Sequence, residues 1–287
     1  MDIVTAIDKI LPEISQEEYF RQFYDIKCDD KFYYIYKHVS FDQDLKVLDI
    51  FKKCLLKFTP PKFFNDPFDC VADIIFESED KTNRSLEISE KMQFNLASKL
   101  SVTCFNNDPL SILMWSHYAD SHKGFLVEFR IPHPFIAPVP SCLNFLAVKY
   151  TNNFPQVLIN SKNYFENLNG NQMLELVSHL YLTKSKEWSY EKEFRVLSWD
   201  YDSNNFQTLL KAIPPICISS VVLGAKLEKD SNNRKEVIKV IEEFNNEHDL
   251  ELKFYQAQLM KNSFNLFVPG HPIIGQSSKT MKDFLAG

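Results

Sequence analysis

Two glutamates and an arginine lie close together in residues 183–199, TKSKEWSYEKEFRVLSW. From Ser189 onward apolar and charged residues alternate, which predicts a strand with Glu191, Glu193 and Arg195 on one face. The opposite face of this strand would carry Tyr190, Lys192, Phe194 and Val196. A charged strand face is either solvated, as charge runs usually are, or it lines a cleft. Both interpretations stay open at this point.

A second stretch with chemistry-bearing side chains is residues 101–130, SVTCFNNDPLSILMWSHYADSHKGFLVEFR. It predicts a strand, a helix and another strand, with Asp108 as the helix N-cap, Pro109 at the first helical position and Gly124 at the helix C-terminus. The helix is dense in stacking and hydrogen-bonding groups, namely Trp115, His117, Tyr118 and His122. Core packing is the commoner use of such a tryptophan, and a satisfied core histidine is the commoner role for His117 on its apolar face.

Asp66 and Asp69 follow two prolines in TPPKFFNDPFDC, a turn that cannot be helix interior. They can bind a metal, but aspartates in turns more often hold the loop through side-chain to backbone hydrogen bonds. The six cysteines are spread along the chain without a CxxC pair. We therefore interpret them as reduced core residues rather than a disulfide frame or a zinc site, with Cys104 an inert thiol.

The composition is that of an ordinary globular protein of 287 residues, with 45% hydrophobic and 24% charged residues. Only 6 glycines argue against a glycine-rich phosphate loop, and a net charge of -6 gives no global nucleic-acid footprint, although a local basic groove is allowed. No apolar run reaches membrane-spanning length, and the first residues lack the pattern of a signal peptide. These features predict a cytoplasmic protein without a membrane partner.

The predicted organisation is a helical extension over 1–28, a single domain over 29–268 and a tail over 269–287. Further strands are expected at 31–40, 54–58, 143–150, 218–223 and 250–259, and helices at 42–56, 171–181 and 229–246. Because strand spacing is irregular and only the segment 229–259 gives a clean helix–strand step, we expect a mixed α+β fold rather than a doubly wound sheet. The extension is expected to dock on the main domain, and a partner-binding arm is the alternative.

Four motifs occur in the order FFNDPFD, WSHYADSHKGFLVEF, KSKEWSYEKEFRVL and ISSVVLG. Over roughly residues 32–260 the chain resembles the bacterial domain-of-unknown-function family 2971 and abortive-infection proteins with a similar WSHYADxHKGF stretch. The order of elements is also similar to the ADP-ribosyltransferase fold. In that fold a first strand carries Arg or His, a central strand carries Ser-Thr-Ser or a Tyr and leads into a helix, and a later strand carries Glu, often as Glu-x-Glu or Gln-x-Glu. This resemblance implies a mostly antiparallel split sheet with flanking helices, and NAD as substrate.

The resemblance also implies roles for the two glutamates and the first strand. Glu193 would accept the ribose 2′-OH and stabilise the ribosyl cation, and Glu191 would orient or deprotonate the acceptor. His38 would hydrogen-bond the adenosine ribose, a role for which Lys37 competes. With Glu193, Glu191 and His38 as catalytic residues, the protein would be an ADP-ribosyltransferase or an NAD glycohydrolase. It would act as a toxin-like or phage-defence effector.

The remaining residues implied by the resemblance bind the substrate. Thr103 would support the pocket, and Tyr118 or Trp115 would stack on nicotinamide. Arg195 would either grip the pyrophosphate or pair with Glu193 as a structural ion pair. Lys37 would belong to this cofactor-binding set as well, and no metal is assigned. The acceptor can be a protein, a nucleic acid or a small molecule, and a regulatory partner protein is possible.

Two rival hypotheses stand beside the transferase. The first is a metal-dependent nuclease, because such sites need several carboxylates that converge on a cation. Its candidate residues are Asp66, Asp69, His117, Glu191 and Glu193. The second is a non-catalytic module in which the WSHY helix forms an aromatic ligand or partner pocket. Sensitivity to chelators and loss of NAD without an acceptor separate the three hypotheses.

Overall fold

The computed structural model describes residues 25–76, 90–91, 93–94, 97–98, 100–133, 145–159, 170–199, 209–274 and 280–286. Most of the predicted N-terminal extension, residues 1–24, lies outside the described residues. Its last residues form isolated bridges, Lys27 with Thr280 and Cys28 with Tyr33. In the predicted tail, residues 269–274 and 280–286 are described, and the second range includes the short helix α8 (Met281–Ala286).

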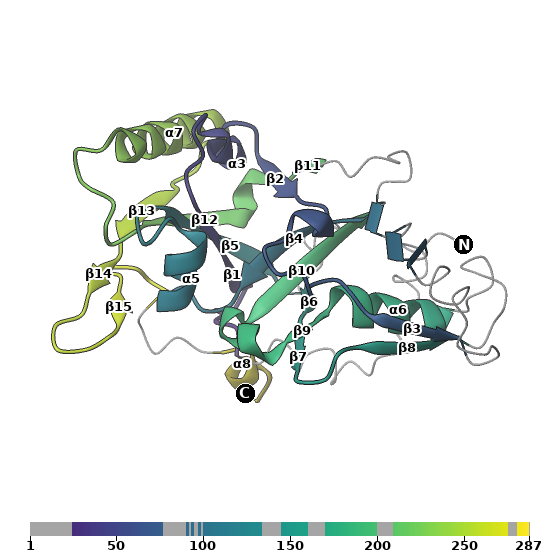
Figure 1. Ribbon diagram of the computed structural model, residues 1–287. Coiled ribbons are helices and arrows are strands. Elements are labelled where there is room, and N and C mark those ends of the chain that lie inside the picture. Colours follow the sequence, from purple (N-terminus) through teal and green to yellow (C-terminus); the bar gives the residue numbers. More distant parts are fainter. Residues whose placement is uncertain are drawn as a thin grey trace.

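A seven-stranded sheet forms the centre of the protein, in the order β13-β12-β5-β1-β4-β10-β6 (Figure 1). Its strands are β1 (Phe32–Val39), β4 (Leu100–Asn106), β5 (Phe125–Pro132), β6 (Leu146–Ala147), β10 (Glu193–Trp199), β12 (Ile218–Leu223) and β13 (Lys253–Gln256). Neighbouring strands are antiparallel except β12 and β13, which are parallel. The predicted mixed, mostly antiparallel α+β class is therefore confirmed.

Four two-stranded pairs lie outside this sheet. They are β2 (Leu55–Phe58) with β11 (Leu209–Ala212), β3 (Asp73–Phe76) with β8 (Gln156–Ile159), β7 (Lys149–Thr151) with β9 (Thr183–Ser185), and β14 (Gln258–Leu259) with β15 (Leu266–Phe267). The pair β2–β11 matters for the site, because Thr59, the residue after β2, bridges to Val102 of β4. This bridge fixes β2 beside the central strand.

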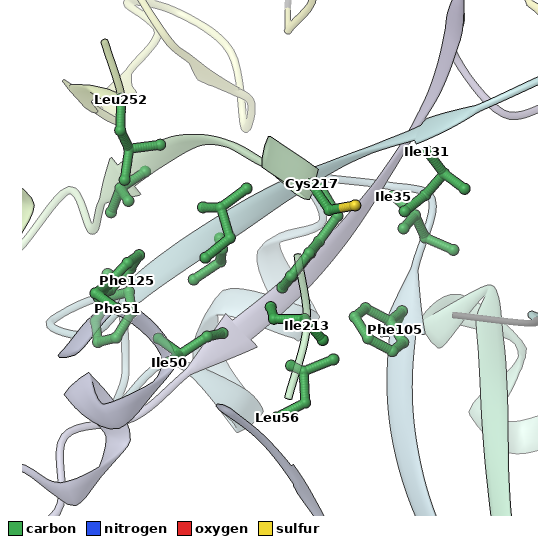
Figure 2. Close-up of a cluster of buried hydrophobic side chains, with 14 of the residues drawn as sticks. Ile35, Ile50, Phe51, Leu56, Phe105, Phe125, Ile131, Ile213, Cys217 and Leu252 are labelled. Atoms are coloured by element: carbon green, nitrogen blue, oxygen red, sulfur yellow. The ribbon is translucent and has the colours of Figure 1, made fainter. Parts of the chain in front are cut away.

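Both faces of the sheet are covered. On one face the helices α3 (Asp49–Lys52) and α7 (Asn232–His248), with the 3-10 helix η1 (Lys46–Leu48), pack on the largest hydrophobic cluster. Figure 2 shows part of this cluster, with Phe51 next to Phe125. On the other face α5 (Ile112–Tyr118) and β14–β15 enclose a second cluster around Tyr36 and Trp115. A third cluster joins α6 (Gly170–Tyr181) to β3 and β8.

Strand β5 shows why both faces need cover. Phe125, Val127 and Phe129 belong to the α7-side cluster, whereas Leu126 belongs to the α5-side cluster. Successive side chains point to opposite faces of a strand, and residues 125–129 of β5 are all buried, Glu128 included, so the strand is covered on both sides. The predicted strand–helix–strand order of residues 101–130 is confirmed by β4, α5 and β5.

The predicted ends of α5 are wrong in detail. Ser111 is the N-cap, and its hydroxyl accepts a hydrogen bond from Met114 N at 3.4 Å. Asp108 instead accepts from Leu110 N in the turn that precedes the helix. The helix ends at Tyr118, and the positive φ angles expected at a C-terminal glycine belong to 120–122. Gly124 serves a close approach, because a Cβ atom there would lie 2.2 Å from Val39 O.

The predicted strand from Ser189 is also wrong in its first part. Residues Lys186–Glu191 form the 3-10 helix η5, and Lys192 adopts a left-handed conformation with φ 45° before β10 begins at Glu193. The strand predicted at 143–150 divides into β6 and β7, and the helix predicted at 42–56 is reduced to η1 and α3. Alternation of residue types cannot distinguish a strand from a 3-10 turn that ends in a left-handed residue.

Candidate functional site

A cavity of about 410 Å³ lies where β1, β4 and β10 meet the loop after β2 and the helix α5. Six of the eight predicted site residues line it, namely Lys37, His38, Thr103, Tyr118, Glu191 and Glu193. The other two, Trp115 and Arg195, are fully buried and lie outside the lining. The cavity has the size of an ordinary small-molecule site.

Glu191 and Glu193 meet at one ammonium group. The Lys184 Nζ donates to Glu191 Oε2 at 2.6 Å and to Glu193 Oε2 at 3.4 Å, and it lies 3.3 Å from Asp69 Oδ2. The two glutamates come from different elements, η5 and β10, so the prediction that they share a strand face is wrong. The left-handed Lys192 between them turns the chain so that both carboxylates still reach Lys184.

Arg195 holds Glu193 from the other side. Its Nε donates to Glu193 Oε1 at 2.7 Å, one Nη donates to Asp69 Oδ2 at 2.6 Å, and the other donates to Tyr181 O at 2.8 Å. With further contacts to Glu193 Oε2 and Cys70 Sγ, the guanidinium uses five N–H donors and is 0% exposed. Of the two roles predicted for Arg195, the structural ion pair is the one present.

The two glutamates have different pKa values. Burial would raise the pKa of Glu193, but the positive charges of Arg195 and Lys184 outweigh burial and lower it to about 2. Burial raises the pKa of Glu191 to about 7; Lys184 opposes this and the charge of Glu193 adds to it. The Tyr118 hydroxyl donates to Glu191 Oε1 at 2.5 Å. Near neutral pH, Glu193 is thus ionised while Glu191 can take up or release a proton.

The first strand contributes a neutral histidine and a lysine. The His38 Nδ1 lies 2.9 Å from Asn106 Nδ2, and burial lowers the pKa of His38 to about 3. The Lys37 Nζ donates to Thr103 Oγ1 at 3.0 Å and to Cys104 O at 2.8 Å. Thr103 therefore supports the site by holding Lys37.

The aromatic residues of α5 divide between core and cavity. Trp115 donates from Nε1 to Pro109 O at 2.8 Å and packs edge-on against His38, which is the core role. Tyr118 lines the cavity. His117 is exposed, lines the cavity and lies 6.0 Å from the Tyr190 ring, so the prediction of a core histidine is wrong.

Many cavity residues were not predicted, and Lys57, Asn106 and Lys184 are among them. Lys184 carried no sequence signal, because one lysine at the start of a polar run resembles any surface lysine.

The two aspartates of the loop after β2 have different roles. Asp66 accepts from Phe68 N at 2.9 Å and holds its loop as predicted, whereas Asp69 joins the ion pairs of Arg195 and Lys184. Burial raises the pKa of the Cys104 thiol, in keeping with the predicted inert cysteine, and the five cysteines that the structure describes are free.

The residue set of the nuclease hypothesis comes together only in part. Asp69, Glu191 and Glu193 converge, but the Lys184 ammonium occupies the point between them. Within the described ranges, no group of three or more His, Cys, Asp or Glu side chains is arranged to hold a metal ion. The three carboxylates that the nuclease hypothesis placed around a metal ion are thus arranged around the Lys184 ammonium group.

Comparison with known proteins gives one match. Residues 114–196 match the model of a family described as Protein of unknown function (DUF2971), so this part of the chain is similar to that family. The matched segment begins within α5 and contains β5, η5 and the Glu191–Arg195 run. No curated protein and no solved structure matches the chain. Among the described helices none has the length and apolar character needed to cross a membrane.

Proposed function

We propose that the cavity binds NAD as a substrate and that the protein cleaves the bond between nicotinamide and ribose, passing ADP-ribose to an acceptor or to water. The observation that carries this proposal is the pair of neighbouring cavity carboxylates, Glu191 and Glu193, with pKa values of about 7 and about 2. Paired titratable groups whose environments push their pKa values apart mark acid–base assignments.

Glu193 suits the stabilisation of a cation. When the C–N bond breaks, its electron pair goes to the nicotinamide nitrogen and neutralises the positive charge of the ring, which leaves an oxocarbenium-like ribosyl group. A carboxylate fixed by Arg195 is ionised before the reaction and needs no reorganisation as this charge develops. The interaction strengthens in the transition state, which is the requirement for catalysis.

Glu191 suits the handling of the acceptor proton. An acceptor hydroxyl, or water, forms the new bond to the ribose carbon and loses one proton, which Glu191 takes. A base works best when its pKa lies near the operating pH, and the pKa of Glu191 meets this condition. Lys184 and Tyr118 each hold one of its oxygens, so the carboxylate is fixed in orientation.

The test is nicotinamide release from NAD by purified protein, with and without cell lysate as a source of acceptor. Glu193→Gln is expected to lower the rate by roughly 10²–10³-fold, the usual cost of a lost electrostatic stabiliser. Glu191→Gln is expected to lower it by roughly 10²-fold or more, as for a lost general base. Glu187→Gln, a change of an exposed glutamate in η5, is the matched control and keeps the wild-type rate.

Thermal unfolding of each variant separates loss of chemistry from loss of fold. No nicotinamide release together with no NAD binding by calorimetry would contradict the proposal. NAD binding without turnover would favour the non-catalytic module instead. A toxin-like or phage-defence role extends the proposal, and it requires that the wild type, but not Glu193→Gln, depletes NAD when expressed in bacteria.

A further inference from the structure

Two lysines line the cavity without a carboxylate partner. They are Lys37 from β1 and Lys57 from β2. The other cations at the site are paired: Lys184 and Arg195 with buried carboxylates, and Lys192 with Asp108 at 3.1 Å. In the part of the chain that the structure describes, no ion pair within 4.0 Å includes Lys37 or Lys57.

Lys37 is held in place with bonding capacity left over. An ammonium has three N–H donors, and two of them go to Thr103 Oγ1 and Cys104 O. Both partners are neutral, so the charge itself is uncompensated by direct contact. Burial lowers the pKa of Lys37; Cys104 and the charge of Glu193 oppose this effect, and the positive charge of Lys57 adds to it. A bound anion would relieve both the effect of burial and that of Lys57.

Lys57 lies on β2, which is bridged to β4 rather than to β1, and its charge acts on Lys37. The backbones of Thr59 and Val102 exchange two hydrogen bonds of 2.8 and 2.9 Å, which fixes β2 beside β4. Lys57 is two residues before this bridge, and the contacts of Lys37 are one and two residues after Val102. β1 and β2 thus lie along the same edge of β4, opposite β10, and the two lysines that they carry both line the cavity.

We propose that Lys37 and Lys57 form an anion subsite that binds the pyrophosphate of a dinucleotide. The pyrophosphate assignment rests on the proposed function, because NAD carries a pyrophosphate between its two ribose groups. Lysine is an effective phosphate ligand, and a charge-assisted hydrogen bond is about twice as strong as a neutral one. Arg195 cannot fill this role in the described arrangement, since its five donors serve Glu193, Asp69, Tyr181 and Cys70.

The test is calorimetric binding of ADP-ribose, with inorganic pyrophosphate and adenosine as partial ligands. ADP-ribose lacks nicotinamide, so its binding needs no turnover. Lys57→Met and Lys37→Met are each expected to weaken ADP-ribose roughly 10- to 100-fold, the usual value of one hydrogen bond to a charged group. Lys57→Arg keeps the charge and is expected to retain most of the affinity. Adenosine, which has no phosphate, is expected to bind the lysine variants and the wild type alike.

Lys53→Met is the matched control, because it removes an exposed lysine just before β2 that is paired with Asp49. It is expected to leave all three ligands unaffected. Unchanged ADP-ribose affinity in Lys57→Met would overturn the subsite, and so would an equal loss for adenosine. Pyrophosphate binding as tight as that of ADP-ribose would replace the dinucleotide with a free phosphate ligand.

The subsite and the proposed function can fail separately. Lysine-dependent ADP-ribose binding without nicotinamide release would keep the subsite and reject the transferase. NAD turnover with an unchanged KM in both lysine variants would keep the transferase and reject the subsite. Lys57 is exposed, so its variants are expected to fold even if Lys37→Met does not.

Discussion

At the scale of single residues, Lys184 connects the two glutamates and lowers the pKa of both. Its ammonium contacts Glu191, Glu193 and Asp69, and only 4% of its side chain is exposed. Burial works against the charged form of Lys184, but the three carboxylates outweigh it and raise its pKa. In the proposed reaction Lys184 is a positioning residue, since it would act through the glutamates.

Replacement of Lys184 by Met should shift the pH dependence of NAD cleavage. Lys184 lowers the pKa of Glu191, so its removal raises that pKa above about 7. The acidic limb of the rate profile, which reports deprotonation of Glu191, is expected to move to higher pH by roughly 1 unit or more. The measurement is the rate of nicotinamide release from about pH 5 to about pH 9, a range that spans this pKa.

Tyr118→Phe is the milder companion to Lys184→Met. It removes one hydrogen bond that lowers the same pKa, so a smaller shift in the same direction is expected. A uniform loss of rate without any shift of the limb would mean that Lys184 has only a structural role.

Lys184→Met also leaves three buried carboxylates without their shared ammonium group. The free energy of unfolding is therefore expected to fall by roughly 3 kcal/mol.

At the scale of elements, the turn between α5 and β5 determines where Tyr118 lies. This turn packs on the end of β1, and Ser40 Oγ donates to Tyr118 O at 3.0 Å. Gly124 is in van der Waals contact with β1, where a Cβ atom would lie 2.2 Å from Val39 O and 2.9 Å from Ala119 C. Both neighbours are backbone atoms, which cannot move without displacing β1 or the end of α5.

Gly124→Ala should therefore destabilise the fold more than an ordinary glycine substitution. We expect a loss of roughly 3 kcal/mol, at the upper end for overpacking. Gly270→Ala is the control, because Gly270 has φ +74° but nothing within 4 Å of its added Cβ. Its cost is the backbone strain alone, about 1 kcal/mol. Urea denaturation of both variants measures the difference, and equal losses would show that the close approach to Val39 is tolerated.

The same elements show what the sequence can predict. Strands β1, β4 and β5 and helix α7 were predicted near their observed bounds. Burial requires apolar residues at regular positions along a strand or helix, and this pattern is visible in the sequence. The boundary at Glu193 was not, because the left-handed Lys192 leaves no compositional mark. Six of eight site residues reach the cavity, but Lys184 and Lys57 join through tertiary contacts that local spacing does not encode.

At the scale of the whole molecule, the described residues include two groups of buried titratable side chains. The first is the cavity, and the second lies under β14–β15, where Glu128 of β5 contacts Ser220 and His271. The Ser220 Oγ lies 3.1 Å from Glu128 Oε1 and 2.9 Å from His271 Nε2. The His271 Nδ1 accepts from Ile273 N and Ile274 N, so Nε2 carries the proton and cannot activate Ser220 as a nucleophile. The second group is thus part of the core.

Glu128 should make the stability of the whole fold depend on pH. Burial raises its pKa from 4.5 to about 7, against hydrogen bonds from Ser220 and Ser219 and the charge of Arg130. The folded state then binds more protons than the unfolded state between these two values, so the contribution of Glu128 to stability falls as pH rises through this window. Burial lowers the pKa of His271 from 6.5 to about 4, so its contribution has the opposite slope between these two values and partly offsets that of Glu128.

Glu128→Gln removes the charge but keeps an oxygen for Ser220. The free energy of unfolding of the variant, relative to the wild type, should therefore increase between pH 4.5 and about 7 and stay constant above it. The total change is on the order of 3 kcal/mol, from the size of the pKa shift. Urea denaturation across this range measures it, with Glu187→Gln as an exposed control that shows no such trend. A difference independent of pH would mean that Glu128 is ionised in the folded protein throughout, so that water or an ion must reach the layer between β5 and β14–β15.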